Sequence, residues 1–249
     1  MKFQLYLFNF FSKLVINFFN IFLKKLTKEI SKKKGFNYSL TIPRTTYSPW
    51  LDNLEFKNFY DQIKKNTLID IYRLYELSSL VKQAELIDGD ILEIGVWRGG
   101  SSAVLRKYSD PGKNLYLVDT FSGVVNASSE DSTYIGEEHK DTGVELVRRF
   151  LDKLSLYSNV VLIRAKFPDD FKMNLNKISF VHIDVDTYFS AKQSFEYIEQ
   201  YLSVGSIVVF DDYAGHTTDG VTSYCNEVKS SSKFTFIHNL NGHAIFIKR

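Results

Sequence analysis

The stretch Asp90-Ile-Leu-Glu-Ile-Gly-Val-Trp-Arg-Gly-Gly-Ser-Ser102 decides the fold. An apolar run leads directly into Gly95 and Gly99, which is typical of a buried strand followed by a tight loop and a helix. Such glycines let a ligand approach the backbone, and we expect Ser101 and Ser102 to cap the helix that follows. The spacing Glu-x-Gly-x-x-x-Gly differs from that of dinucleotide sites and lacks the Gly-Lys-Ser/Thr of a phosphate loop. It predicts a binding loop, and the alternative is a tight turn without a ligand.

Length and composition predict one α/β domain with a modest appendage. The chain has 249 residues, of which 44% are hydrophobic and 24% charged, enough for one well-filled core. Its net charge is +2 and much of its lysine lies near the N-terminus, so no basic stripe indicates nucleic acid as a partner. A single cysteine, Cys225, excludes an internal disulfide and a cysteine-based metal site, as is typical of a cytoplasmic protein.

The N-terminus predicts an amphipathic helix. Residues 3–23 are mostly aliphatic and aromatic, and polar side chains recur there and just beyond at helical spacing. These polar residues are Asn9, Lys13, Asn17, Asn20 and Lys24. A lysine-rich run at 24–34 follows. We therefore expect residues 1–44 to form a helical extension that lies on the cytoplasmic face of a membrane with anionic head groups.

Three alternatives stay open for this extension. A spanning helix would be just long enough, but Lys13 would lie near the middle of the bilayer at a cost of a few kcal/mol. A secretory signal would need a small-residue cleavage site, which does not follow the segment. The helix could instead pack on the domain or on a second copy of the chain in a homo-oligomer. In each case we expect the catalytic domain over residues 45–249.

Helical and apolar stretches alternate along this domain. A helical pattern at 67–85 precedes short apolar runs without polar alternation, which predicts a parallel sheet covered on both faces. The runs lie at about 91–96, 114–119, 160–165, 180–185 and 206–210. Two later runs, at 234–239 and 243–249, flank the turn Leu240-Asn241-Gly242 and predict an antiparallel hairpin. The expected fold is a parallel α/β sheet closed by a hairpin.

The second apolar run ends on Asp119, about twenty residues after the glycine loop. At this place in an open α/β sheet, an acidic side chain accepts hydrogen bonds from the two hydroxyls of a ribose. We expect Asp119 and the adjacent Thr120 to contact a cofactor that carries a ribose. The alternative is that Asp119 only caps the following loop.

Four carboxylates follow two later strands. Asp184 and Asp186 come at the end of one, and Asp211 and Asp212 at the end of the next. Because the carboxyl ends of parallel strands meet at one edge, we expect all four to converge there, where a divalent cation such as Mg²⁺ would neutralise them. Strand alternation would put Asp184 and Asp186 on one side, so that one binds metal and the other receives a proton. The alternative is that these acids cap loops or pair with Lys and Arg.

These motifs together resemble a known family. The stretches GDILEIGVWRGGSS, LVDTFSG, VHIDVDTYFSAKQSFEYI, VGSIVVFDDYAG and GHAIFIKR are similar to the macrocin O-methyltransferase (TylF-like) family of class I enzymes that use S-adenosylmethionine. The resemblance covers about residues 67–249. It implies a Rossmann-like class I methyltransferase sheet of about seven strands, the last one antiparallel, in agreement with the hairpin.

The resemblance also implies a role for each candidate residue. The cofactor contacts would be Glu93, Gly95, Gly99, Ser101, Asp119 and Thr120. The cation ligands would be Asp184, Asp211 and Asp212. Asp186 would be the general base, with His139 as an alternative base or lid residue, whereas we expect His182 to be structural. The sequence departs from the family at Ala165 and Lys166, where glycine is more frequent, and in the stretch 214–228.

The implied activity is transfer of a methyl group to a sugar hydroxyl. A metal would lower the pKa of the attacked hydroxyl and orient it while Asp186 takes its proton. Combined with the N-terminal helix, the resemblance favours a glycan precursor methylated at the cytoplasmic face during surface polysaccharide biosynthesis. Two other classes are weighed against it: an NAD-dependent sugar enzyme, which the glycine spacing disfavours, and a membrane-tethered nucleoside-binding module, which leaves the four acids unexplained.

Overall fold

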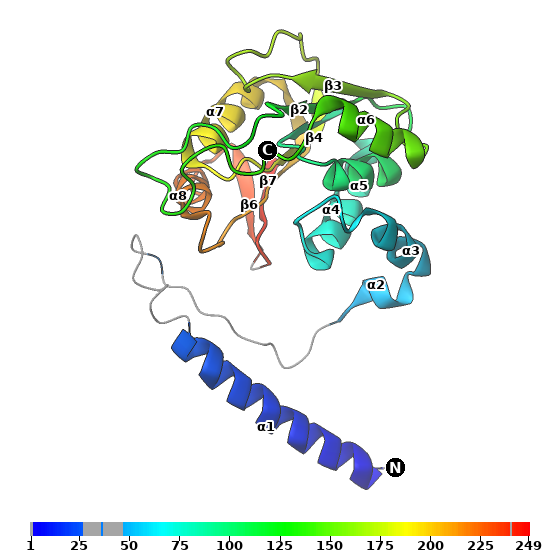
Figure 1. Cartoon of the computed structure of the whole chain (residues 1–249), viewed down its shortest axis with the longest axis vertical. Helices are drawn as coiled ribbons and strands as arrows, with labels where there is room; N and C mark the ends of the chain where they lie inside the picture. Colours follow the sequence, from blue (N-terminus) through cyan, green and yellow to red (C-terminus); the bar gives the residue numbers. More distant parts are fainter. Residues whose placement is uncertain (1, 27–35, 37–46, 240) are drawn as a thin grey trace. The chain divides into compact units, whose positions relative to one another are not determined.

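The computed structural model describes residues 2–26, 36, 47–239 and 241–249. These divide into two compact units, one within residues 1–52 and one within residues 53–249. The first unit contains helices α1 (Lys2–Leu26) and α2 (Pro49–Asp52) (Figure 1). The lysine-rich run beyond residue 26 and the expected domain start at residue 45 lie outside the described residues, as does Leu240 of the expected turn.

The second unit is a seven-stranded sheet in the order β3-β2-β1-β4-β5-β7-β6. Its strands are β1 (Asp90–Ile94), β2 (Leu115–Asp119), β3 (Val160–Arg164), β4 (Ile178–Ile183), β5 (Leu202–Phe210), β6 (Phe234–His238) and β7 (Ala244–Lys248). The first five pair in parallel, whereas β7 is antiparallel to both β5 and β6. The expected class I methyltransferase sheet with an antiparallel last strand is therefore confirmed.

Helices cover both faces of this sheet. Figure 1 shows α4, α5 and α6 on one side and α7 and α8 on the other. The helices are α3 (Leu54–Ile63), α4 (Ile71–Gln83), α5 (Gly100–Tyr108), α6 (Val144–Lys153), α7 (Tyr188–Ile198) and α8 (Asp219–Val228), with short 3₁₀ turns at Ala84–Leu86 and Glu199–Tyr201. Every residue of β4 is buried, because both of its faces are covered. This explains why the strands read as continuous apolar runs.

An aromatic cluster joins the C-terminal hairpin to the rest of the core. The ring of Phe195 on α7 lies 5.4 Å from that of Phe210 on β5 and 5.8 Å from that of Phe246 on β7. Phe210 and Phe246 are fully buried. Burial of such side chains stabilises the fold by about 1.5–3 kcal/mol each, and it fixes the end of β5, where the acidic residues begin.

Three backbone hydrogen bonds extend the sheet just beyond its strands. The N–H of Gly95 donates to Val118, that of Asp184 to Ile94 and that of Asp211 to Ile183, at 2.9, 2.8 and 2.9 Å. The loops after β1, β4 and β5 therefore start in register on neighbouring strands. This registration brings the glycine loop and the acidic residues to one edge.

The expectation that Ser101 and Ser102 cap the helix after this loop is wrong. Helix α5 begins at Gly100, and Gly99, with a φ of 83°, occupies the cap position. A glycine reaches this left-handed conformation without the strain that a side chain would cause. Both serines lie within the first turn of α5, where Ser102 donates a hydrogen bond to Glu93.

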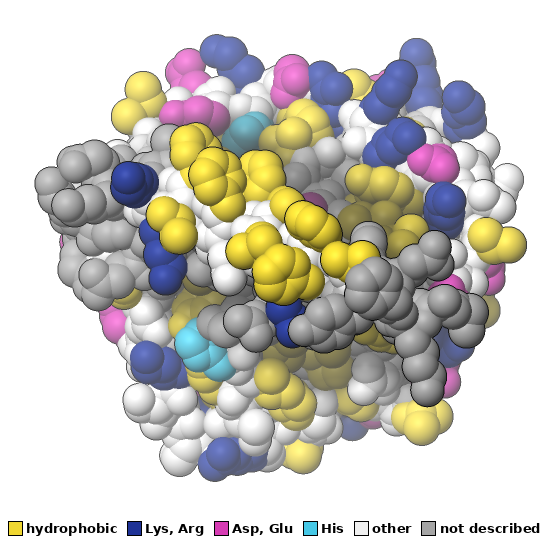
Figure 2. All heavy atoms as spheres, turned by 90° about the horizontal axis from the view of Figure 1, so that it is seen from below, with side chains coloured by type: hydrophobic (Ala, Val, Ile, Leu, Met, Phe, Trp, Pro, Cys, Tyr) yellow, Lys and Arg dark blue, Asp and Glu magenta, His cyan; other side chains and the backbone are white. Residues whose placement is uncertain are grey.

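Helix α1 exposes many large hydrophobic side chains among those that the structure describes. The large exposed ones are Leu7, Phe10, Phe11, Leu14, Val15, Phe18, Phe19, Ile21 and Phe22. Figure 2 shows them as a band along the helix. The amphipathic helix expected over residues 3–23 thus forms, although none of the described helices combines the length and hydropathy that crossing a membrane requires.

Candidate active site

A cavity of about 210 Å³ opens at the carboxyl ends of β1, β2, β4 and β5. Gly95, Ser101, Asp119 and Thr120 of the expected cofactor set line it, as do the four acids and His139 of the expected catalytic and metal set. Glu93 and Gly99 lie outside its wall. One cavity therefore joins the glycine loop to the acidic edge.

Gly95 is the contact point between these two parts. Its φ is 89°, and a Cβ atom built on it would lie 1.7 Å from the carbonyl oxygen of Asp184. That separation is far below any tolerated contact, so a side chain at this position would force the two loops apart. The glycine allows the backbone after β1 to pack directly on the backbone after β4.

Asp119 shapes the glycine loop with its carboxylate. Its Oδ2 accepts hydrogen bonds from the N–H groups of Val96 and Trp97, at 2.7 and 2.9 Å, and its Oδ1 accepts one from Phe121 at 2.6 Å. Trp97 and Phe121 are left-handed, with φ values of 45° and 50°. A carboxylate has about four acceptor sites. The hydroxyl of Thr120 approaches Oδ1 as well, at 3.5 Å. Asp119 therefore holds the loop, and it also lines the cavity.

Glu93 and His182 form a buried pair beneath the loop. His182 Nδ1 lies 2.9 Å from Glu93 Oε1, and the hydroxyl of Ser102 donates to the other oxygen of Glu93. All three side chains are inaccessible to solvent or nearly so. In this position Glu93 ties β1 to β4 and α5 and does not face the cavity.

Three of the four acids converge. Carboxylate oxygens of Asp184, Asp186 and Asp212 all lie within 4.8 Å of one another. The strand-alternation argument for the first two is wrong, because β4 ends at Ile183 and Asp186 is left-handed with a φ of 61°. A turn, not an extended strand, brings these carboxylates together.

This acid group has the properties of a cation site. Burial, followed by the negative charges of Asp211 and Asp212, raises the pKa of Asp184 well above its usual value. Oδ2 of Asp212 is buried and meets no hydrogen-bond partner among the described residues. Clustered, partly unsatisfied carboxylate oxygens match the donors that Mg²⁺ prefers. The side chains present therefore fit a hard divalent cation.

Asp211 is oriented differently from its neighbours. Its Oδ1 lies 2.7 Å from Arg73 Nη1 and 3.1 Å from His243 Nε2. Burial opposes the ionisation of Asp211, but the contacts with His243 and Arg73 outweigh it and lower the pKa to about 2. Asp211 is thus a fixed anion at the edge of the acid group.

The loop between β2 and α6 supplies a tyrosine that the sequence analysis missed. The hydroxyl of Tyr134 lies 3.1 Å from His139 Nε2, and both residues line the cavity. Burial and the negative charge of Asp186 raise the pKa of Tyr134. Burial also raises the pKa of Asp186, and a hydrogen bond from Tyr134 opposes this. Tyr134 therefore links His139 to the predicted general base.

Arg73, Glu76 and His243 were missed as well. Arg73 and Glu76 lie on α4, and His243 directly precedes β7. Arg73 and Glu76 fall in the stretch 67–85, which was interpreted as a helical pattern, and the stretch GHAIFIKR, which contains His243, was quoted only for the family resemblance. No local pattern marks these residues, because Asp211 lies 138 positions from Arg73 in the sequence.

Solved structures share this fold. The O-methyltransferase NovP aligns with a TM-score of 0.63 at 18% identity, covering 95% of this chain and 99% of that one. CalS11, a calicheamicin methyltransferase, aligns with a TM-score of 0.59 at 18% identity, covering 82% and 94%. An O-methyltransferase from Bacillus cereus in complex with SAH aligns with a TM-score of 0.52 at 14% identity, covering 91% and 98%. The strand order, the antiparallel β7 and the glycine loop define the class I methyltransferase fold.

Within that class, the sequence identifies the family. The chain belongs to the macrocin-O-methyltransferase (TylF) family, which it matches over residues 62–249. It is 32% identical over 168 residues to the 8-demethyl-8-(2,3-dimethoxy-alpha-L-rhamnosyl)-tetracenomycin-C 4'-O-methyltransferase of Streptomyces olivaceus, covering 60% of this chain and 63% of that one. It is 26% identical over 168 residues to the mycinamicin III 3''-O-methyltransferase of Micromonospora griseorubida, covering 59% and 65%. The chain thus spans just under two thirds of the length of these curated relatives.

Proposed function

We propose that this protein is an S-adenosylmethionine-dependent, metal-assisted O-methyltransferase that acts on a sugar hydroxyl of a glycoside or glycan precursor. The observation that carries the proposal is the single cavity that joins the glycine loop of a TylF-family fold to converging carboxylates. The names of two relatives support a sugar acceptor, since one is a methyltransferase of a rhamnosyl-tetracenomycin and the other of mycinamicin III.

The cofactor would occupy the side of the cavity formed by Gly95, Ser101, Asp119 and Thr120. S-adenosylmethionine supplies a methyl group on a positively charged sulfur. Gly95 and Ser101 line this side of the cavity together with Asp119, and a carboxylate at this place in the sheet suits a ribose hydroxyl. Glu93 and Gly99 support this loop from outside the cavity.

A divalent cation would be held by Asp184 and Asp212 of the converging group, with Asp211, which lies at the edge of that group, as the third ligand. When bound, such a cation lowers the pKa of a coordinated hydroxyl and orients it. Asp211 would contribute a carboxylate whose pKa is low, because the contacts with His243 and Arg73 outweigh the effect of burial. The raised pKa of Asp184 and the unpartnered oxygen of Asp212 are the features that a cation would relieve.

Asp186 is the proposed general base. As the acceptor oxygen forms its bond to the methyl carbon, the bond from that carbon to sulfur breaks and Asp186 takes the hydroxyl proton. The hydrogen bond from Tyr134 opposes the burial effect on Asp186 and helps to keep it ionised. His139, in contact with Tyr134, is the alternative base or a residue that closes the cavity.

Metal removal tests the chemistry directly. We expect excess EDTA to abolish methyl transfer, and added Mg²⁺ to restore it, while S-adenosylmethionine still binds in calorimetry. Asp184→Asn should lose activity in the same way, whereas Asp88→Asn, at an exposed acid paired with Lys177, should not. Full activity in EDTA would exclude a role for the metal in methyl transfer. Binding of NAD in place of S-adenosylmethionine would exclude methyl transfer as the reaction.

We also propose that α1 holds the enzyme at the cytoplasmic surface of an anionic membrane. Nine of its described large hydrophobic side chains are exposed, and residues 2–26 include lysines but no acidic residue. A helix of this kind lies in the interface with its apolar side chains buried and its lysines near the head groups. This placement favours a glycan precursor of surface polysaccharide biosynthesis as the acceptor.

A further inference from the structure

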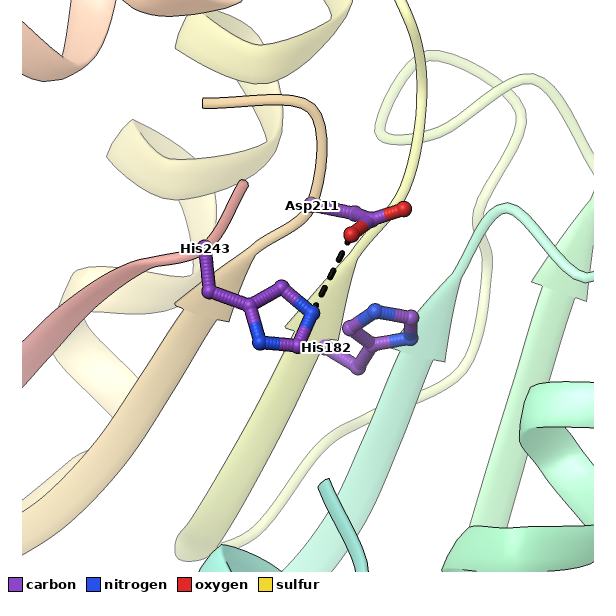
Figure 3. Close-up of side chains that lie close together, drawn as sticks. All are labelled: His182, Asp211 and His243. Carbon is purple, nitrogen blue, oxygen red and sulfur yellow. Dashed lines mark ion pairs between the residues drawn. The ribbon is translucent and has the colours of Figure 1, made fainter. Parts of the chain in front are cut away.

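His243 is a buried imidazole that lies between two carboxylates. Its Nδ1 is 2.6 Å from Glu76 Oε2, and its Nε2 is 3.1 Å from Asp211 Oδ1. The side chain of His243 is fully buried. Figure 3 shows the imidazole reaching Asp211 from the start of β7, across the end of β5. Three separate elements, α4, β5 and β7, therefore meet through this one side chain.

The far end of this chain of contacts is fixed as well. Glu76 is held at both oxygens, because the amide of Asn239 donates to Oε1 while His243 contacts Oε2. Glu76 thus ties the hairpin between β6 and β7 to helix α4. It holds the imidazole ring at its Nδ1 atom and so sets the direction of Nε2.

Both contacts on Asp211 use the same oxygen. Arg73 Nη1 and His243 Nε2 each approach Oδ1, and Arg73 is itself held by Asp70 at 2.9 Å. In Figure 3 the other oxygen of Asp211 points away from His243. Fixing one oxygen of a carboxylate determines where the second one lies.

We propose that His243, held by Glu76, is a positioning residue that fixes Asp211 so that its second carboxylate oxygen serves the cation together with Asp184 and Asp212. The inference rests on the proposed metal-assisted function. It assigns a role to α4 and to the C-terminal hairpin, neither of which contributes a proposed cation ligand. Partners of this kind orient a ligand before the ion arrives, and their loss typically weakens metal binding by about 10–100-fold.

A different reading of the same cluster is a transition-metal site. His182, Asp211 and His243 offer ligand atoms within 4.8 Å of one another. Among the residues that the structure describes, neither His182 Nε2 nor His243 Nε2 makes a hydrogen bond of good geometry, although His243 Nε2 lies at ion-pair distance, 3.1 Å, from Asp211 Oδ1. Two contacts disfavour an ion there. Arg73 already occupies Asp211 Oδ1, at 2.7 Å, so this oxygen is not free to bind an ion beside His243, and the ion pair between His243 and Asp211 needs the proton that a metal would displace.

Binding of Mn²⁺ to the full chain, followed by electron paramagnetic resonance without cofactor or acceptor, tests the proposal. We expect His243→Gln to weaken Mn²⁺ binding about tenfold or more. Glu76→Gln, which keeps the shape of the side chain, should weaken it by a smaller factor. The matched control is His238→Gln, at an exposed histidine on β6, and it should bind Mn²⁺ as the unmodified chain does.

Two further measurements separate positioning from general damage. The affinity for S-adenosylmethionine should stay within about twofold of the unmodified chain in His243→Gln and in Glu76→Gln, because neither substitution touches the glycine loop. In an Asp211→Asn background, His243→Gln should cause no further loss of Mn²⁺ affinity, since the two residues act through one carboxylate. A purely structural role would instead lower both affinities and add to the effect of Asp211→Asn.

The possible failures are distinguishable. Unchanged Mn²⁺ affinity in His243→Gln overturns the positioning role while leaving the proposed metal intact. Absence of Mn²⁺ binding by the unmodified chain overturns the metal-assisted function and this inference with it. A tetrahedral Co²⁺ absorption spectrum that disappears in both His182→Gln and His243→Gln would replace positioning with direct ligation.

Discussion

Gly95 is the residue at which the glycine loop touches the acidic edge. Gly95→Ala would place a Cβ atom 1.7 Å from the carbonyl oxygen of Asp184, at a φ of 89° that alanine rarely adopts. We expect the free energy of unfolding to fall by about 3 kcal/mol or more, and S-adenosylmethionine binding to be lost. Chemical denaturation and calorimetry measure the two effects.

Gly143→Ala is the control for this change, because an added Cβ there meets nothing within 4 Å and its φ of 173° is ordinary extended backbone. Equal stability of the two variants would show that the close approach at Gly95 does not constrain the loop.

Tyr134 influences the pKa of Asp186 through a hydrogen bond. Because this bond lowers a pKa that burial raises, Tyr134→Phe should raise the pKa of Asp186 further. A base must be deprotonated to act, so the acidic limb of the kcat/KM profile should move to higher pH and activity should fall first on the acid side. The pH profile with excess Mg²⁺ is the measurement. The control is Tyr157→Phe, because the ring of Tyr157 contacts Arg148 away from the cavity, and this variant should leave the pH profile unchanged. If the acidic limb does not shift in Tyr134→Phe, then Tyr134 does not influence the pKa of Asp186.

At the scale of residues, sequence analysis identifies those whose role can be recognised from a short stretch of sequence. A glycine spacing and paired acids at strand ends are visible in short stretches, and the structure brings Asp184, Asp186 and Asp212 together. Arg73 and His243 could not be inferred, because their meeting with Asp211 depends on how α4 and β7 pack. Asp211 is oriented differently from the other acids because of these two partners, so its orientation could not be inferred from the sequence either.

At the scale of elements, the strands were predicted from their apolar runs. The prediction succeeds because a parallel sheet covered on both faces requires apolar side chains on both sides of each strand. It is weaker at strand ends. Residue 185 was expected in the fourth strand, yet β4 ends at Ile183, and β5 begins at Leu202, four residues before the expected start. Turn geometry set by tertiary contacts decides these boundaries.

The loop that carries Tyr134 and His139 is held by Asp131. Oδ1 of Asp131 accepts the N–H of Tyr188 at the start of α7, at 2.9 Å, and its Oδ2 accepts the N–H of Ser128 at 3.0 Å. Asp131→Ala should therefore free the loop, raise amide hydrogen exchange over residues 128–139 and lower kcat by about tenfold, with cofactor affinity unchanged. Hydrogen exchange with mass spectrometry measures the first effect.

Glu130→Ala removes the exposed neighbouring acid and is the matched control. If Asp131→Ala leaves exchange across the loop at the level of this control, Asp131 does not hold the loop.

At the scale of the whole molecule, the membrane proposal makes a solution prediction. The full chain should sediment with anionic vesicles, and binding should weaken as salt screens the lysines. Phe18→Glu, at a side chain 70% exposed on α1, should reduce binding at every salt concentration. A chain that begins at Tyr47 should stay in solution yet methylate a soluble sugar nucleotide. If the full chain does not sediment with anionic vesicles, membrane binding is excluded. Self-association measured by ultracentrifugation would then indicate that α1 pairs with a second copy of the chain.

The overall fold was predictable, whereas the acceptor was not. The parallel sheet and its antiparallel last strand were expected from the apolar runs, the hairpin and the family resemblance, whereas the order of the strands comes from the structure. In the proposed function the acceptor would be recognised by the shape of a cavity that many distant segments line. The residues that would determine which acceptor binds are therefore scattered along the chain, and no short motif contains them.

The place of β7 between β5 and β6 also has a consequence for how the protein is made. The ribosome synthesises β6 before β7, yet β6 pairs only with β7 in the sheet. Until β7 emerges, β6 has no strand to join and the edge of β5 stays open, which exposes the nascent chain to misassembly. His243 emerges together with β7, so the second partner of Asp211, after Arg73, arrives when the sheet closes. A nascent chain would therefore already contain the glycine loop and all four acids before β7 is available to complete the sheet that holds them in position.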